Sequence, residues 1–180
     1  TPLGGDVQST WRALLAGVSG ISTIDADWVA KYELPVTFAG QAKVPASEVL
    51  TPQEAKRLDP SSQFALIAAR EAWADAGSPE VQPERLAVEY ATGIGGVWTL
   101  LDAFETLKER GPRRVLPMTI PMLMPNGPAA AIGMDIAARG GVRTAVSACA
   151  SSTEAIANAI TRLQSGEIDV VVAGGCESGI

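Results

Sequence analysis

The chain has 180 residues, 47% of them hydrophobic, and its 14 basic and 20 acidic residues give a formal net charge of −6. This length and composition allow a sizeable buried core and exclude a disordered tail, and the simplest interpretation is one domain or part of one. The acidic balance argues against a general electrostatic grip on nucleic acid or on an anionic membrane. We therefore expect neither among the partners, and any basic docking surface must be local.

Two cysteines and the absence of histidine limit the chemistry of the chain. Cys149 and Cys176 provide no disulfide framework, and both follow segments typical of buried strand ends, which favours a reducing compartment. Without histidine the commonest general base and metal ligand is missing, and no metal site is expected. No segment approaches the roughly 20 apolar residues of a membrane helix, and the first ten residues lack a signal-peptide pattern. The cytoplasm is the default location.

The first third of the chain predicts little regular structure. Apolar residues at helical spacing indicate a short helix over residues 9–17, with Ser9 or Thr10 as its cap. Residues 21–52 mix Val, Pro, Gly and isolated charges without sustained periodicity, so they predict loops and turns, with an edge strand near residues 36–39.

The middle of the chain has a clearer pattern. Steps of three and four residues between apolar positions predict a helix over residues 61–76, capped by Asp59 or Ser61. Residues 86–91 then predict a strand, followed by the glycine turn TGIGG and by a helix over residues 97–110. The order is strand, glycine turn, helix.

The last third repeats that order. Prolines interrupt the chain until a helix predicted over residues 129–138, which Gly140 and Gly141 would terminate. A strand over residues 142–146 leads through SACASS to a helix that ends at Gly166, and the apolar run DVVVA predicts a strand covered on both faces. Alternating strands and helices predict an α/β layered sheet.

Cys149 lies where a predicted strand gives way to a helix, so its sulfur should sit near the helix N-terminus. Unpaired backbone N–H groups and the positive end of the helix dipole favour a thiolate there, and the thiolate is the nucleophile. Ala148 and Ala150 leave space around the sulfur, while Ser151 and Ser152 can cap the helix. A backbone N–H of the same turn could stabilise the oxyanion formed when a thioester is attacked.

Spacing alone leaves a simpler interpretation open, in which Cys149 is a small apolar side chain filling a tight corner. We assign that role to Cys176, because no helix is signalled after it. The TGIGG turn matches neither a dinucleotide fingerprint nor a P-loop and is better explained as a tight turn that lets backbone approach a helix, so no cofactor is expected. The adjacent basic pairs are candidates for holding an acidic or phosphate-bearing partner, or are solvated surface. They are Lys56-Arg57 and Arg113-Arg114.

Several segments, in order, resemble the elongating β-ketoacyl-acyl carrier protein synthases of the thiolase-like superfamily. They are TPLGGDVQSTWRALLAGVSGIS, RLDPSSQFALIAAREAWADAG, TGIGG, GPRRVLP, PMLMPNGPAAAIG, SACASSTEAI and DVVVAGGCES. The resemblance implies a layered α-β-α architecture of two similar halves, of which residues 1–180 would be the N-terminal half without its first strand. The two histidines and the lysine that such enzymes use would lie in a C-terminal half, and this half alone should be incompetent for condensation.

The same resemblance implies a reaction and a site. Cys149 would accept an acyl group from acyl carrier protein, and a malonyl unit on a second carrier would lose carbon dioxide and attack the acyl thioester. Ile94, Thr119 and Met124 would line the acyl pocket, and residues 141–146 would lie at the two-fold interface of a homodimer. The two basic pairs would form the carrier-docking patch.

Other members of the superfamily remain as alternatives. A non-catalytic chain-length-determining partner commonly carries another residue at the nucleophile position, so Cys149 argues against it. Starter-unit synthases and thiolases differ in their flanking segments. Fatty-acid elongation is preferred over aromatic-polyketide elongation, and a binding domain with an inert cysteine remains the alternative from a different class.

Overall fold

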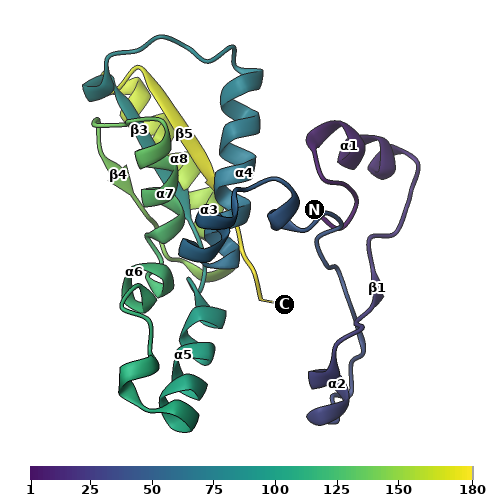
Figure 1. Cartoon of the computed structure of the whole chain (residues 1–180). Helices are drawn as coiled ribbons and strands as arrows, with labels where there is room; N and C mark the ends of the chain where they lie inside the picture. The colour runs from purple at the N-terminus through teal and green to yellow at the C-terminus, as the bar shows by residue number, and fades with distance from the viewer. Residues whose placement is uncertain (180) are drawn as a thin grey trace. The chain divides into compact units, whose positions relative to one another are not determined.

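The computed structural model of the chain describes residues 1–179, which divide into two compact units, residues 1–48 and residues 49–179 (Figure 1). Within the described residues, no helix is long and apolar enough to cross a membrane.

The first unit holds two short helices, one two-stranded antiparallel ribbon and one turn of 3-10 helix. These elements are α1 (Val7–Leu15), β1 (Ser22–Thr23), α2 (Asp27–Lys31), β2 (Phe38–Ala39) and η1 (Ala46–Glu48). Helix α1 begins before the predicted position, because Asp6 rather than Ser9 or Thr10 is its N-cap; the Asp6 side chain accepts from the Ser9 N–H at 2.6 Å. The strand expected near residues 36–39 is present as β2, whereas α2 was not predicted.

The second unit carries the sheet and most of the helices. Its elements are α3 (Pro52–Arg57), α4 (Pro60–Asp75), η2 (Pro83–Arg85), β3 (Leu86–Ala91), α5 (Val97–Arg110), η3 (Pro112–Arg114), α6 (Thr119–Leu123), α7 (Gly127–Asp135), β4 (Val142–Arg143), η4 (Ala148–Ala150), α8 (Ser151–Gln164) and β5 (Val170–Gly175).

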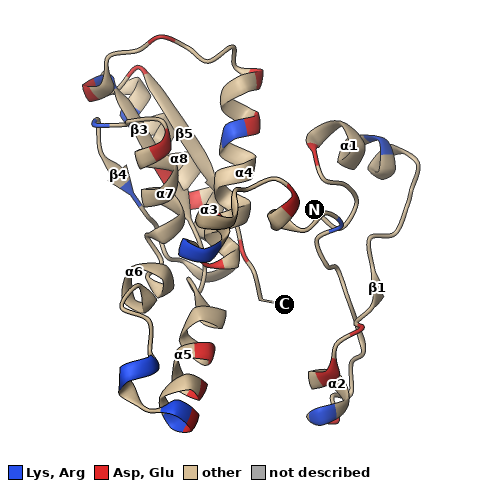
Figure 2. Ribbon diagram, in the orientation of Figure 1, with Lys and Arg blue, Asp and Glu red and all other residues tan. Residues whose placement is uncertain are grey.

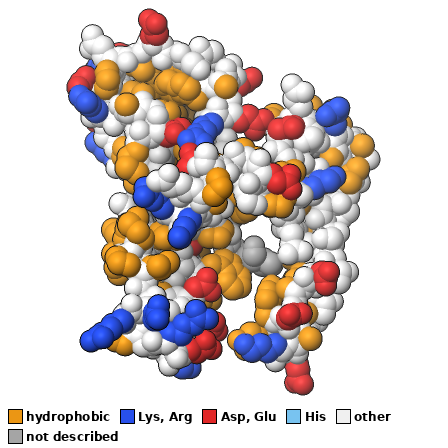
Figure 3. Space-filling model, viewed as in Figure 1, with side chains coloured by type: hydrophobic (Ala, Val, Ile, Leu, Met, Phe, Trp, Pro, Cys, Tyr) orange, Lys and Arg blue, Asp and Glu red, His pale blue; other side chains and the backbone are white. Residues whose placement is uncertain are grey.

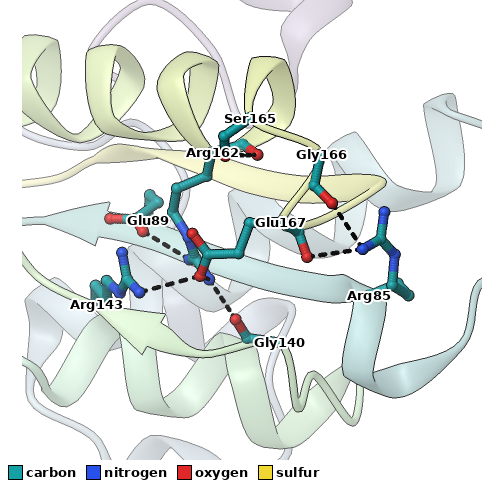
Figure 4. Close-up of polar contacts among 8 residues, drawn as sticks. All are labelled: Arg85, Glu89, Gly140, Arg143, Arg162, Ser165, Gly166 and Glu167. Carbon is teal, nitrogen blue, oxygen red and sulfur yellow. Dashed lines mark hydrogen bonds and ion pairs between the residues drawn. The ribbon is translucent and has the colours of Figure 1, made fainter.

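Three parallel strands in the order β4-β3-β5 form the sheet, with β3 buried in the middle. Because successive side chains of a strand point to opposite faces, Val88 and Tyr90 pack with α4 and α7, while Glu89 reaches α8. Figure 4 shows α8 on one side of the strands and helices on the other. The α/β layered sheet predicted from the sequence is confirmed.

Small residues allow the helices to pack closely against the sheet. Ala65 and Ala69 of α4 meet Ala129 and Ile132 of α7 in the core cluster. A Cβ atom added to Gly133 would lie only 2.6 Å from Val142 Cγ2, so α7 runs close over β4.

The structure differs from the predictions for two strands, in the length of β4 and in the burial of β5. Strand β4 ends at Arg143 instead of residue 146, because as an edge strand it has a ladder partner on one side only and can leave the sheet early. Strand β5 is the other edge, and its residues are half-buried or exposed rather than covered on both faces.

The proline-rich stretch also differs from its prediction. It contains the short helix α6, and α7 ends at Asp135 rather than at the glycines. The end is set by Ala137, whose φ of +55° is left-handed, while the N–H of Ala138 donates back to the Gly133 carbonyl at 2.9 Å. Gly140 instead begins the pairing with β3, since its N–H donates to the Leu86 carbonyl at 2.8 Å.

Candidate functional site

Cys149 lies in η4, the single 3-10 turn directly before α8. The turn is closed by Ser151, whose hydroxyl accepts from the Ser147 N–H at 2.8 Å and donates to the Ala148 carbonyl at 2.7 Å. Ala148 has a φ of +50°, a left-handed conformation that is uncommon for a residue with a Cβ. The turn thus holds a strained backbone immediately before the cysteine.

The side chain of Cys149 is exposed. The expectation of a buried strand end is therefore wrong for this cysteine, because β4 has already ended and the intervening loop carries the chain out of the sheet. Neither of the serines proposed as caps is the N-cap of α8. That residue is Ala150, which offers no side-chain acceptor, so the positive dipole end of α8 lies beside the cysteine without a side-chain cap, and the first helical N–H, that of Ser151, donates to the Ala148 carbonyl.

The glycine turn after β3 backs directly onto this cysteine turn. A Cβ atom added to Gly93 would lie 3.2 Å from the Ala148 carbonyl oxygen and 3.0 Å from Oε2 of Glu177. Only a residue without a side chain leaves room for so close an approach. Segments around residues 93, 148 and 177, far apart in the sequence, therefore meet at one point.

The other end of the glycine turn contacts the segment between α6 and α7. The N–H of Gly96 donates to the Leu123 carbonyl at 3.1 Å, and a Cβ atom added to Gly95 would lie 2.8 Å from that oxygen. The predicted close approach of the glycine turn to a helix is confirmed. The same contact brings the turn that carries Ile94 against the segment that carries Met124.

Asp59 ties this region to two helices. Its buried carboxylate accepts from the N–H and hydroxyl of Ser61 at the start of α4, and from the hydroxyl of Thr99 in the first turn of α5 at 2.7 Å. Because Gly96, the N-cap of α5, has no side chain, Asp59 supplies from 40 residues away the acceptor that the helix lacks. The sequence predicted Asp59 as a cap of α4 but not its contact with α5.

Thr119 and Arg114 line a small cavity of about 120 Å³ between α5, η3 and α6. Ile94 and Met124 are not among its lining residues, and 59% of the Ile94 side chain is exposed. The three residues predicted as pocket walls are thus distributed over the glycine turn and both ends of α6, without enclosing one cavity within the described residues.

The two basic pairs occupy different elements. Lys56 and Arg57 form the last turn of α3, whereas Arg113 and Arg114 belong to η3. The basic positions of α3 and those near the end of α5 are coloured as separate groups on the ribbon in Figure 2, and Figure 3 draws basic side chains on the same face. Apolar side chains gather over α6 on the same face (Figure 3), where the exposed large residues include Leu116, Met118, Ile120 and Met124.

Cys176 lies in a more buried environment than Cys149. It packs against the core cluster, and its sulfur donates to the Ser61 carbonyl at 3.1 Å. Burial raises the pKa of the Cys176 thiol to about 12. Its assignment to the core is confirmed.

The far end of α8 is fixed by a group of ion pairs (Figure 4). Arg162 donates to Glu89 of β3 at 2.8 Å, to Glu167 at 2.7 Å and to the Gly140 carbonyl. Arg85 holds the same loop by donating to the Gly166 and Glu167 carbonyls at 2.8 and 3.0 Å. The helix that begins beside Cys149 is therefore anchored to the sheet at its other end.

Sequence reasoning missed Thr92 and Glu177. Oε1 of Glu177 accepts from the Thr92 hydroxyl at 2.9 Å, and Oε2 accepts from the Gly93 N–H at 2.8 Å. A signal existed, because a polar residue stands one position after β3 and another two positions after β5, and the ends of parallel strands meet at one edge of a sheet. Among the described residues, no group of three or more His, Cys, Asp or Glu side chains could hold a metal ion.

The chain is similar to known proteins in both sequence and structure. A 3-oxoacyl-[acyl-carrier-protein] synthase 2 from Mycobacterium tuberculosis is 39% identical over 180 residues, which are 100% of this chain and 43% of that protein. The crystal structure of a β-ketoacyl synthase from Burkholderia phymatum superposes with a TM-score of 0.81 at 27% identity, covering 99% of this chain and 45% of that one.

A second structure shares the fold alone. It is a type II polyketide acyl carrier protein in complex with its ketosynthase, named AntDE:AntF, with a TM-score of 0.71 at 15% identity over 76% of this chain and 40% of that one. These ketosynthase neighbours confirm the thiolase-like fold class.

The chain spans less than half the length of the curated relative from Mycobacterium tuberculosis. The family model for the N-terminal domain of β-ketoacyl synthases matches residues 1–180. The chain therefore belongs to the β-ketoacyl synthase family and carries the N-terminal domain of that family.

Proposed function

We propose that the whole protein is a β-ketoacyl-acyl carrier protein synthase in which Cys149 takes up the acyl chain. The observation that carries this proposal is the exposed cysteine turn at the N-terminus of α8, which has no side-chain cap, with the glycine turn after β3 packed behind it. Its relatives named 3-oxoacyl-[acyl-carrier-protein] synthase 2 support it. Residues 1–180 would form the N-terminal half of a two-half fold.

The first half-reaction is acyl transfer. The Cys149 sulfur attacks the carbonyl carbon of the acyl thioester on the carrier, and the carbonyl oxygen becomes an oxyanion beside the N–H groups of the η4 turn and of α8. Collapse of this intermediate breaks the bond to the carrier's phosphopantetheine sulfur. The departing thiolate takes up the proton that Cys149 gives up, so the step needs no redox partner.

The second half-reaction is condensation. A malonyl group on another carrier loses carbon dioxide, and the electron pair left on its α-carbon attacks the thioester on Cys149. The new carbon–carbon bond forms as the bond to the Cys149 sulfur breaks, which regenerates the thiolate and leaves a β-ketoacyl carrier product. The groups that assist decarboxylation would come from the second half of the protein.

Ile94, Thr119 and Met124 remain the proposed walls of the acyl pocket. The contact between the glycine turn and the end of α6 supports grouping Ile94 with Met124. Thr119 begins α6 and lines the cavity of about 120 Å³. In the complete assembly, other parts of the protein would then cover the apolar side chains of α6 that are exposed here.

We also propose that this assembly is a homodimer with residues 141–146 at its two-fold axis. β4 has a free edge, and Val142 and Val146 are 40% and 55% exposed. Thr144 and Arg162 are among the residues that line a hollow of about 360 Å³ there, and each has one buried polar atom, Oγ1 and Nε, without a partner among the described residues. Sedimentation of the full-length protein as a monomer at micromolar concentration would contradict the dimer.

The proposed partner is acyl carrier protein, which would bind at the two basic pairs. Carrier proteins are acidic, and a chain of net charge −6 needs local positive surface to receive one. Lys56-Arg57 and Arg113-Arg114 would contact the carrier from α3 and η3. The neighbouring structure AntDE:AntF is a ketosynthase in complex with its carrier. A free nucleophilic thiol suits a reducing compartment, and the cytoplasm is the proposed location.

A reconstituted condensation assay tests the function. The full-length protein, an acyl carrier protein loaded with a saturated acyl chain and a second one loaded with malonate should give a β-ketoacyl carrier product two carbons longer. Cys149→Ser should abolish product, while Cys176→Ser should retain it if the variant folds. Product from Cys149→Ser at the parent rate would refute the assignment, and activity only with poly-β-keto intermediates would favour the polyketide alternative.

A further inference from the structure

We propose that Glu177 is a positioning residue for the nucleophile, and that it acts by holding the glycine turn after β3 against the turn that carries Cys149. The inference rests on the proposed function and goes beyond it, because neither the acyl-transfer step nor the pocket assignment uses Glu177. Two sets of contacts support it. Glu177 accepts hydrogen bonds from Thr92 and Gly93, and Gly93 in turn lies close to Ala148.

Both carboxylate oxygens of Glu177 are engaged although the side chain is exposed. Oε1 accepts from the Thr92 hydroxyl at 2.9 Å, and Oε2 accepts from the Gly93 N–H at 2.8 Å. An ionised carboxylate accepts at both oxygens, whereas a glutamine amide would turn an NH₂ group toward one of these two donors. The Thr92 hydroxyl could accept from such an amide only by ceasing to donate, so glutamine cannot keep both hydrogen bonds in their present direction.

Thr92 connects the Glu177 carboxylate to the rest of the glycine turn. While its hydroxyl donates to Glu177, the same oxygen accepts from the Gly95 N–H at 3.1 Å. Thr92 is itself buried. The hydroxyl thus links the Glu177 carboxylate to the backbone of the glycine turn. This backbone carries Ile94, and it contacts the end of α6.

The opposite side of Gly93 meets the cysteine turn. Its added Cβ would be 3.0 Å from Glu177 Oε2 and 3.2 Å from the Ala148 oxygen, so Gly93 is enclosed between the carboxylate and that carbonyl. Ala148 precedes Cys149 and already has a strained φ of +50°. A shift of the glycine turn would allow Ala148 to relax, and the sulfur would move with it.

The backbone of the sheet builds Glu177 into this place. The register pairs Ala91 with Gly175, and the Cys176 N–H donates to the Ala91 carbonyl at 3.0 Å. Thr92, directly after β3, and Glu177, the second residue after β5, consequently meet at the same edge. A Cβ atom added to Gly175 would be 2.8 Å from Ser152 Cβ, so this edge also contacts the first turn of α8.

Positioning and simple charge predict opposite effects on Cys149. A negative charge near a thiol disfavours the thiolate, so if Glu177 acted only through its charge, Glu177→Gln would accelerate alkylation of Cys149. If it acts through its hydrogen bonds, the same substitution loosens the two turns and slows both alkylation and acyl transfer. The direction of the change distinguishes the two roles without reference to overall stability.

The test uses the full-length protein and the variants Glu177→Gln, Thr92→Val and the double variant, with Thr92→Ser as the conservative replacement. Glu80→Gln, at an exposed glutamate on the loop after α4, is the matched control. We measure the rate of Cys149 alkylation by iodoacetamide, single-turnover acyl transfer from carrier protein, and thermal unfolding. A misplaced nucleophile should lower single-turnover acyl transfer about 10-fold or more.

The expected result is a similar loss in Glu177→Gln, Thr92→Val and the double variant, because both residues act in one unit. Thr92→Ser and Glu80→Gln should stay near the parent rate. Faster alkylation or unchanged acyl transfer in Glu177→Gln would overturn the positioning role and leave the proposed function intact. If the parent accepts no acyl group on Cys149, the proposed function fails, while the alkylation rates still decide the role of Glu177.

Discussion

Nη1 of Arg162 lies 2.8 Å from Oε1 of Glu89, and the two side chains are only 4% and 1% exposed (Figure 4). This pair joins the helix that begins beside Cys149 to the central strand of the sheet. Arg162 also pairs with Glu167 at 2.7 Å, so the buried guanidinium bridges strand, helix and loop. The helix that follows the Cys149 turn is thus tied to the sheet near its other end.

Removing one partner of the buried pair should be strongly destabilising. Glu89→Leu leaves Arg162 buried beside an apolar side chain and should lower the free energy of unfolding by about 3 kcal/mol or more, as measured by denaturant titration. The double variant Glu89→Leu, Arg162→Met should recover much of that loss, because the buried guanidinium is removed together with its buried partner, while Glu167 keeps its pair with Arg143.

The exposed pair of Arg139 and Glu84, 3.6 Å apart, provides the control. Arg139→Ala should change the free energy of unfolding by less than about 1 kcal/mol. Equal losses for Glu89→Leu and Arg139→Ala would contradict the role assigned to burial.

Acid should remove the contribution of Glu54 to stability. A hydrogen bond from Arg70, and then those from Thr51, lower the pKa of Glu54 from 4.5 to about 2. A lowered pKa in the folded state means that the ionised carboxylate stabilises the fold above pH 4.5, and that this contribution disappears as the pH falls toward about 2. The difference in Tm between parent and Glu54→Gln should therefore be largest near neutral pH and shrink below pH 4.5.

Circular dichroism melts at several pH values check this dependence, with Glu80→Gln as the exposed control. A difference for Glu54→Gln that stayed constant or grew on acidification would show that the hydrogen bonds to Glu54 do not stabilise the fold.

The two cysteines should be labelled at clearly different rates by a thiol reagent. At neutral pH, iodoacetamide should modify the exposed Cys149 much faster than Cys176, because burial raises the pKa of the Cys176 thiol to about 12 and shields its sulfur. Peptide mapping after short exposure gives the two rates, and Cys149→Ser should eliminate the fast phase. Comparable labelling of both positions would mean that Cys149 is no more accessible or reactive than a core thiol.

Charge reversal at η3 should weaken carrier delivery but not the chemistry. Arg113→Glu combined with Arg114→Glu should raise KM for a carrier-bound acyl substrate by about 10-fold and flatten its salt dependence. Turnover of a small carrier-free thioester should fall much less, because Cys149 and α8 are untouched and only the cavity that Arg114 lines together with Thr119 is altered. Arg139→Glu, at an exposed arginine elsewhere, serves as the matched reversal. Equal losses on both substrates would assign the arginines to folding instead.

Local sequence signals predicted the parts of the fold that depend on local physics. The helix over residues 61–76 and the strand over residues 86–91 have strong periodicity and clear boundaries, and the structure has α4 and β3 there. Boundaries failed where a distant contact or an unusual φ decides them. Helix α7 ends at a left-handed Ala137, and no residue type in that stretch signals such a conformation.

The candidate site was predictable only in part. The strand-cysteine-helix order placed Cys149 before α8, but its exposure could not be foreseen, because the early end of β4 depends on which strands flank it in space. Asp59 and Glu177 act across 40 and 84 residues of sequence, on Thr99 and Gly93. Such contacts follow from the packing of the elements, which periodicity does not determine.

The central claim is that Cys149 itself receives the acyl chain. The most direct measurement incubates the full-length protein with acyl-loaded carrier protein, withholds the malonyl substrate so that the intermediate accumulates, and maps the modified peptide by mass spectrometry. The account predicts one acyl adduct, bound through a thioester to Cys149, and none on Cys149→Ser. An adduct confined to Cys176, or no adduct on the parent protein, would contradict it.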